Sequence, residues 1–327
     1  MISLTKHKPL SQAVVHKRTG LQALVEYISQ NWPFFVLAAP ALVLIFLFSY
    51  IPMLGTVIAF EDFSPRTGFF SQWVGLRNFS LLWSSPVVLR LLRNTVGLNA
   101  MFIAAETFTA VVLALLLNEV RSTLFKRVSQ SVMFLPYFMG WTIVAMVLFG
   151  LIDYEVGTIN ALLVKMGLAK VLITNNPNLW PGILTAIRVW KGAGAGCIIY
   201  LAVLVGVDPQ LYEAAAIDGA GRWQRIRHIS LPALGPVIIL LTLLAIGRIF
   251  YGDIGMIYAV VGNRATLYPT TDVIDTYILR ALSKNANYGF SAAVGLSQAL
   301  LGFVCIYGSN WLVKKYSQAR GEDYTLF

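Results

Sequence analysis

Long apolar runs, each close to the length that crosses a lipid bilayer, constrain this chain more than any other feature. A membrane-spanning helix needs about 20 mostly apolar residues, because the hydrocarbon offers no water to exposed backbone groups. Such stretches occur at roughly 34–58, 95–118, 130–152, 183–206, 233–254 and 290–313. The sequence therefore predicts an all-α, polytopic membrane protein with six transmembrane helices. An even number of spans places both termini on the same side.

Composition favours a membrane protein over a soluble one. Charged residues make up 12% of the chain, whereas soluble domains carry about 25%. The net charge of +10 fits basic residues held against anionic membrane lipid, so nucleic acid is not an expected partner. Cys197 and Cys305 both lie in apolar runs, and we expect two small hydrophobic side chains rather than a disulfide.

The apolar runs divide the chain into a polar start, a transmembrane domain and a short tail. The first run begins near Phe34, too far from the N-terminus for a usual signal peptide, and is expected to be an uncleaved span. The expected parts are residues 1–33, 34–313 and 314–327. Within the first part, residues 19–30 place apolar side chains on one helical face, which would lie on the membrane surface or pack on a partner.

A charged segment at 207–236 interrupts the apolar runs between the fourth and fifth spans. Asp208-Pro209 is a strong helix start, since Asp caps the first turn and Pro lacks only an N–H that would be unpaired there. Gly219 is placed to end this helix. A second short helix is expected from about Arg222 to Ile229, with Pro232 stopping it and turning the chain into the fifth span. In the first helix the apolar side chains form one stripe, and Glu213 lies off it. The stripe consists of Leu211, Tyr212, Ala215 and Ala216.

Such a segment on its own fits an ordinary amphipathic loop helix, but its residues follow a specific spacing. Glu213-Ala214-Ala215 is followed by Asp218-Gly219 and, after nine residues, by Ile229-x-Leu231-Pro232. This resembles the EAA loop of permease subunits in bacterial ATP-binding-cassette (ABC) importers. Ile226 departs from the family, where Phe is frequent. The resemblance implies that the segment is a cytoplasmic coupling helix, that it docks in a cleft of the ATPase subunit, and that Glu213 makes a charged contact there.

The resemblance extends over about residues 30–315. It is carried by Tyr50-Ile-Pro52-Met, Trp73-Val-Gly75-Leu-Arg-Asn78-Phe79, Leu115-Leu-Leu-Asn118-Glu119-Val-Arg121 and Asp272-Val-Ile-Asp275-Thr-Tyr277, among others. These segments are similar to the oligo- and polysaccharide branch of the carbohydrate permeases, including the membrane subunits of alginate-type importers. The implied fold is that of the MetI- and maltose-permease-like proteins.

The resemblance also implies partners and a location. The expected partners are a second permease subunit, two ABC ATPase subunits, an extracytoplasmic substrate-binding protein, an oligosaccharide and membrane lipid. The chain would lie in the bacterial cytoplasmic membrane with both termini inside. Three outside loops, at about 59–94, 153–182 and 255–289, carry aromatic residues expected to be exposed, namely Trp73, Trp83, Trp180 and Tyr268.

A few ionisable residues lie in or near the expected spans: Glu106, Arg188, Lys191, Arg248 and Asp253. Charges there are costly and indicate a transport path by default. In one interpretation these residues pair with one another, or Arg188 and Lys191 extend to the outer interface. In the other, Arg188, Lys191 and Arg248 line the path of a sugar and meet its carboxylates. Aromatic side chains such as Trp190, Phe250 and Tyr251 are candidates for stacking on pyranose rings. An excess of cations over acids favours an acidic sugar, such as a uronate oligomer.

The sequence lacks the motifs of an enzyme. It has no G-x-x-x-x-G-K-[ST] phosphate loop and no H-E-x-x-H, and its three histidines lie in polar segments, so no metal is expected. Gly192-Ala-Gly194-Ala-Gly196 lies in a span and favours close helix packing. We expect no cofactor on this chain, with ATP and Mg²⁺ on the partner ATPases. The alternatives are an ion-gradient-driven secondary transporter, for which Glu106 is the main support, and a membrane enzyme.

Overall fold

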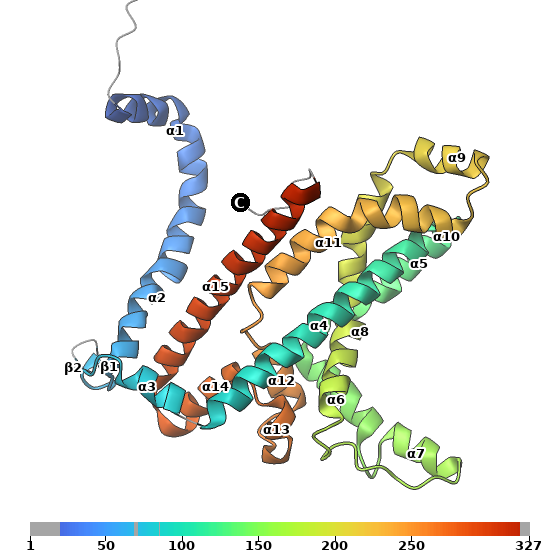
Figure 1. Ribbon diagram of the computed structural model, residues 1–327. Coiled ribbons are helices and arrows are strands. Elements are labelled where there is room, and N and C mark those ends of the chain that lie inside the picture. Colours follow the sequence, from blue (N-terminus) through green and yellow to red (C-terminus); the bar gives the residue numbers. More distant parts are fainter. Residues whose placement is uncertain (1–19, 69–70, 85, 321–327) are drawn as a thin grey trace, which may run out of the picture. The chain divides into compact units, whose positions relative to one another are not determined.

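The computed structural model describes residues 20–68, 71–84 and 86–320 (Figure 1). The chain divides into two compact units, Met1–Thr56 and Val57–Phe327. The boundaries expected near residues 33 and 313 stay predictions. The side chains of Leu21, Leu24 and Val25 lie outside the described part, and so the amphipathic face expected at 19–30 also stays a prediction.

The described part of the first unit is one apolar helical run. It comprises α1 (Gly20–Ile45), a π-helical turn (Phe46–Tyr50), α2 (Ile51–Met53) and the start of a 3₁₀ helix (Leu54–Phe60). The stretch Tyr27–Phe60 is long and apolar enough to cross a membrane, and no residue in its most apolar segment is buried within the protein. The first expected span is therefore confirmed.

The second unit is helical apart from one small hairpin. Strands β1 (Glu61–Asp62) and β2 (Gln72–Trp73) pair antiparallel, with Glu61 opposite Trp73. The longer helices are α4 (Pro86–Asn118), α5 (Thr123–Phe134), α6 (Trp141–Ile152), α8 (Trp180–Val205), α11 (Leu231–Ile246) and α15 (Tyr288–Arg320). The shorter ones are α3 (Arg77–Ser84), α7 (Thr158–Lys165), α9 (Pro209–Ile217), α10 (Arg222–Arg225), α12 (Ile254–Val260), α13 (Tyr268–Thr271) and α14 (Ile274–Asn285). The described residues thus hold five helices able to span a membrane, or six if one bent pair counts as a span, and the all-α fold is confirmed.

The expected third span, 130–152, is broken rather than continuous. Helix α5 ends at Phe134, a 3₁₀ turn covers Leu135–Phe138, and α6 starts at Trp141 after a bend of 101°. Pro136 cannot donate the backbone hydrogen bond that would continue the helix, and Gly140 takes an extended conformation. The predicted apolar segment is present, but Pro136 and Gly140 bend it into two helices.

The fifth span, expected at 233–254, ends earlier than expected. Helix α11 stops at Ile246, and residues 247–253 are irregular. Backbone carbonyls freed by this unwinding are bonded from other helices: Asn99 Nδ2 donates to Ile249 O at 2.9 Å and to Tyr251 O at 3.1 Å. Non-helical backbone at membrane depth is tolerated only with such partners or beside water.

The α4–α8 pair forms the centre of the second unit. It is the most extensive helix pairing among the described residues. The predicted role of the α8 glycines is confirmed, because a Cβ at Gly192 would collide with Glu106 of α4 and one at Gly194 with the Met133 carbonyl of α5.

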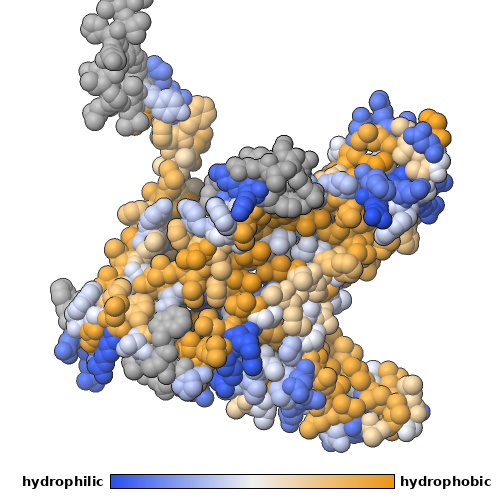
Figure 2. Space-filling model, viewed as in Figure 1, coloured by the Kyte–Doolittle hydropathy of each residue, from blue (hydrophilic) through white to orange (hydrophobic). Residues whose placement is uncertain are grey.

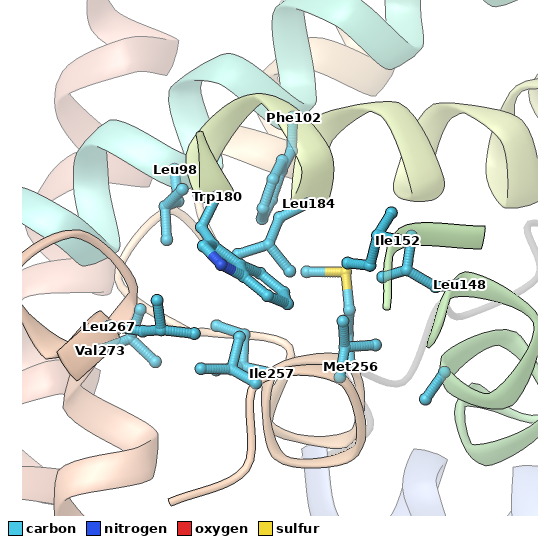
Figure 3. Packing of buried hydrophobic residues seen from close by; sticks show 13 residues of the cluster. Leu98, Phe102, Leu148, Ile152, Trp180, Leu184, Met256, Ile257, Leu267 and Val273 are labelled. Carbon is cyan, nitrogen blue, oxygen red and sulfur yellow. The ribbon is translucent and has the colours of Figure 1, made fainter. Parts of the chain in front are cut away.

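At one end of this pair, Trp180 fills a hydrophobic cluster with Phe102, Leu184 and Met256 (Figure 3). Trp180 is 0% exposed, so its expected exposure was wrong, whereas Trp73 is exposed as expected. The first residue of α8 therefore belongs to the core that joins α4, α6 and α12.

Candidate functional site

The coupling segment begins with α9, whose two ends are capped as the sequence predicted. Asp208 Oδ1 accepts a hydrogen bond from Gln210 N at 2.9 Å, and Pro209 occupies the first turn. At the other end Gly219 has φ +79°, and Ala220 N donates to Ala215 O at 2.9 Å. Together with the bond from Gly219 N to Ala216 O, this is a Schellman cap, which needs a left-handed residue after the helix.

The surface of the coupling segment is open. Glu213, Ala214, Asp218 and Gly219 are exposed, and so are two large apolar side chains, Ile217 at 86% and Trp223 at 72%. The expected apolar stripe is only partly covered: Tyr212 and Ala215 are half-buried, while Leu211 and Ala216 are exposed. Tyr212 Oη lies 3.0 Å from Ser230 Oγ, and this contact ties α9 to the following helix.

The turn expected at Pro232 does not exist. Residues Arg222–Ile246 form one helical run: α10, a π-helical turn at Ile226–Ser230, then α11. Leu231 N donates to Ile226 O, five residues earlier, as in a π-helical turn. Pro232 comes directly after this turn and lies in the first turn of α11. Leu231 and Pro232 are both exposed at this junction. The lever is therefore a helix, a glycine bend and a helix continuous with the fifth span.

A cavity of about 580 Å³ lies between α4, α8 and the irregular segment after α11. Four of the expected path residues line it: Arg188, Arg248, Tyr251 and Asp253. Asn99 and Phe102 of α4 complete the polar and aromatic parts of the wall. Unwinding of residues 247–253 is what presents Arg248 and Tyr251 to this space.

An ion-pair network lies at one side of the cavity. Arg188 Nε donates to Glu106 Oε2 at 3.2 Å, and Arg188 Nη1 donates to Asp253 Oδ2 at 3.3 Å. Its guanidinium also lies 5.1 Å from the ring centre of Phe102. The other oxygen of Asp253 accepts from Met256 N and caps α12. One cation thus joins α4, α8 and α12 by pairing with two carboxylates.

Arg248 differs from Arg188 in having no ion pair with any residue that the structure describes. It is exposed and lines the cavity. The alternative in which Arg248 pairs with Asp253 within this chain does not hold, because Asp253 pairs with Arg188.

The remaining two expected path residues lie elsewhere. Lys191 Nζ donates to Tyr137 O at 2.6 Å, at the α5–α6 break, and lies over the rings of Tyr137 and Trp141. Trp190 lines a separate apolar groove between α6 and α8. The structure therefore does not bring Lys191 or Trp190 into the cavity.

Three residues outside the expected set shape this site. Besides Asn99, Asp275 Oδ2 accepts from Gly252 N at 2.6 Å, and Gln298 Nε2 donates to Phe250 O and to Asp275. Burial raises the pKa of the Asp275 carboxyl, partly offset by its bonds to Gly252 and Gln298. A polar residue inside an otherwise apolar run, as at Asn99 and Gln298, was the available signal.

Comparison with known proteins agrees with these features. Residues 106–318 match the family described as "Binding-protein-dependent transport system inner membrane component". The chain is 37% identical to the polygalacturonan/rhamnogalacturonan transport system permease protein YteP of Bacillus subtilis, over 95% of this chain and 96% of that protein.

Two solved structures are also similar to this chain over most of its length. A bacterial ABC transporter involved in import of the acidic polysaccharide alginate has a chain with TM-score 0.81 and 31% identity, over 90% of this chain and 99% of that one. The alginate transporter in complex with an alginate pentasaccharide-bound periplasmic protein matches with TM-score 0.80 and 30% identity, over 89% and 97%. The fold and the coupling lever define an importer permease. The chain belongs to the family of binding-protein-dependent inner-membrane transport components.

Proposed function

We propose that this chain is one permease subunit of an ATP-driven importer for an acidic oligosaccharide. A binding protein delivers the sugar on the outer side, and one of the two ATPase subunits docks on the coupling segment on the cytoplasmic side. A second permease chain completes the path, and both termini of this chain lie inside. Movement of the coupling helices alternates the cavity between outward and inward access. The chain itself carries no ATPase motif, and ATP and Mg²⁺ bind to the partner subunits.

The exposed face of α9 and α10 supports docking of the ATPase. Apolar side chains such as Ile217 and Trp223 would not remain in water without cost, and Ile217 lies one helical turn after the charged Glu213. A buried aromatic anchor with a charged contact beside it is typical of protein interfaces. Helix α10 continues into α11 without a break, so a push on α9 would pass through the glycine bend and along this helix to the wall of the cavity.

The lack of an ion-pair partner for Arg248 is the observation that most favours an acidic substrate. Arg248 lies in the cavity wall without a carboxylate partner among the described residues, because the neighbouring Arg188 pairs with both nearby acids. A uronate carboxylate can form a bidentate pair with a free guanidinium. Tyr251 beside it offers a ring face for the sugar.

The similar proteins support the same substrate class. YteP is described as a transport system permease for polygalacturonan/rhamnogalacturonan, and the matching solved transporter imports alginate, an acidic polysaccharide. A secondary transporter driven by ions would need a membrane acid free to titrate. Glu106, its main candidate, is instead held by Arg188.

The test is substrate-stimulated ATPase activity of the reconstituted importer with its binding protein. Uronate oligomers and neutral oligomers of equal length are compared on the wild type and on Arg248→Gln. Loss of one charged contact should raise the uronate concentration for half-maximal stimulation about tenfold, corresponding to about 1.4 kcal/mol. Arg66→Gln, in the exposed β1–β2 loop, is the matched control and should change nothing. Equal stimulation by the neutral series, or an unchanged Arg248→Gln response, would remove the acidic substrate.

A further inference from the structure

Residues 153–179, which join α6 to α8, form an ordered hairpin. Asp153 Oδ1 accepts from Glu155 N at 2.9 Å and from Val156 N at 3.0 Å, and these bonds hold the pKa of the Asp153 carboxyl below its ordinary value. Asn160 of α7 is buried and bridges the two sides of this loop: Nδ2 donates to Asp153 O at 3.2 Å and to Val171 O at 3.1 Å, and Oδ1 accepts from Val171 N at 2.9 Å. These hydrogen bonds fix the backbone of residues 153–179, and so they also fix the position of its outer surface.

That surface is aliphatic and exposed. The side chains of Val156 and Met166 are 81% and 72% exposed, and Leu162, Val164 and Leu168 are each more than half exposed. Figure 2 shows hydrophobic side chains gathered over α7. A contiguous aliphatic surface on an ordered hairpin indicates a binding face rather than a solvated loop.

The hairpin adjoins an apolar groove of about 400 Å³ between α6 and α8. Its lining is entirely hydrophobic and includes Val147, Leu151 and Trp190. Helix α7 packs against α6, whose last residue, Ile152, directly precedes the hairpin. The groove and the hairpin thus form successive parts of one apolar face.

We propose that this face is a lipid-binding surface: the hairpin lies in the membrane interface, and the α6–α8 groove takes an acyl chain. The hairpin sits at the opposite end of α8 from the coupling segment, and α8 has 26 residues, about 39 Å. The leaflet concerned is the one away from the ATPases. Lys165, exposed in the last turn of α7, is placed to reach a lipid phosphate, and Tyr154 stacks with Lys170 at the edge of the face.

Lipid fits this face better than a soluble partner does. A binding protein docks and leaves in each transport cycle. Between cycles the aliphatic side chains would be exposed to water, which costs about 25 cal/mol for each Å² of apolar surface. Lipid covers them at all times. Aliphatic chains bordered by Lys and Tyr are the composition of interfacial segments. The choice of leaflet rests on the proposed ATPase docking, whereas the lipid-binding surface itself needs only the membrane spans and does not depend on the substrate.

Spin labels test the proposal in the complete importer in lipid nanodiscs. Single cysteines at Val147, Val156, Leu162 and Met166 would carry a nitroxide, in a background of Cys197→Ala and Cys305→Ala. Asn175, exposed in the same hairpin, is the water-facing control. Collisions with oxygen, which concentrates in hydrocarbon, are compared with collisions with a water-soluble nickel chelate.

We expect the four labels to collide with oxygen several-fold more than with the nickel chelate, and the label at Asn175 to do the reverse. Nickel collisions at Leu162 and Met166 as frequent as at Asn175 would show that the face is in water. Exclusion of both reagents would show that protein covers it, either the second permease or the binding protein. Either result overturns the proposal.

Discussion

Two arginines of the same cavity have different environments. Arg188 is held by Glu106 and Asp253, which lie on α4 and at the start of α12. Arg248 stands on an unwound segment and has no carboxylate partner among the described residues. The first arginine joins helices, and the second is available to a ligand. A sequence pattern assigns both to the same class, because only the folded chain decides which acids reach which cation.

Removal of the joining cation should destabilise the protein. In Arg188→Met, two partly buried carboxylates lose their partner, at a cost of about 2 kcal/mol, since hydrogen bonds to charged groups contribute about 1.5–3 kcal/mol. The melting temperature of the purified subunit should fall by several degrees. Arg248→Met is the matched control and should melt close to the wild type. Similar melting of both variants would contradict the network as a structural joint.

The left-handed glycine of the lever gives a second prediction. Gly219 has φ +79° and open space around it, so Gly219→Ala would be strained by about 1 kcal/mol without a steric clash. We expect α9 to loosen at its end and the ATPase subunit to be retained less well when the permease is purified. Gly219→Asn should be milder, since Asn tolerates this conformation. If Gly219→Ala retained the ATPase as well as wild type, the bend would not matter for docking.

Helices were predictable from the sequence where length and local signals agree. The first, second, fourth and sixth spans follow from apolar runs, and α9 follows from Asp208, Pro209 and Gly219. The bounds predicted for the third and fifth spans were wrong in detail. Hydropathy is averaged over a window of residues, and this averaging hides the proline and glycines that break these helices. The π-helical turn before Pro232 has no simple local signature. The bonds that stabilise residues 247–253 come from Asn99, Asp275 and Gln298, far away in the chain, so local patterns could not reveal them.

Close helix packing leads to a prediction with a control on the same helix. A Cβ at Gly194 would collide with the Met133 backbone, whereas a Cβ at Gly182 meets nothing within 4 Å. Gly194→Ala should push α5 away from α8 and cost about 1–3 kcal/mol, as overpacking does. Gly182→Ala should be neutral. Thermal unfolding of both variants measures this, and equal stability would refute the close approach.

Helix α8 separates two structurally distinct ends of the second unit. Figure 1 shows α9 and α10 at one end of α8 and α7 at the other. Between them lies the cavity, walled by α4, α8 and the segment after α11. The separation of these ends, about 39 Å along α8, matches a membrane with its interfaces. Under the proposed function, a signal from an ATPase docked at α9 and α10 would therefore travel along helices to reach the cavity.

This arrangement predicts opposite accessibility for two exposed positions. With the coupling segment inside, a cysteine at Gln224 of α10 should resist an impermeant thiol reagent in intact cells, and one at Asn175 should react. Both positions are exposed in the structure, so burial does not account for a difference. Permeabilised cells provide the control, in which Gln224 should also react. Reaction of Gln224 from outside would reverse the orientation.

The break in the third span also has a consequence for biosynthesis. Helix α6 has 12 residues, about 18 Å, and cannot cross a hydrocarbon layer of about 30 Å alone. Its buried residues Leu148 and Ile152 pack with Met256 and Ile257 of α12, which the ribosome makes much later. While the chain is being synthesised, α6 has no α12 to pack against. Its final placement must therefore wait until α12, beyond the fifth span, has been synthesised.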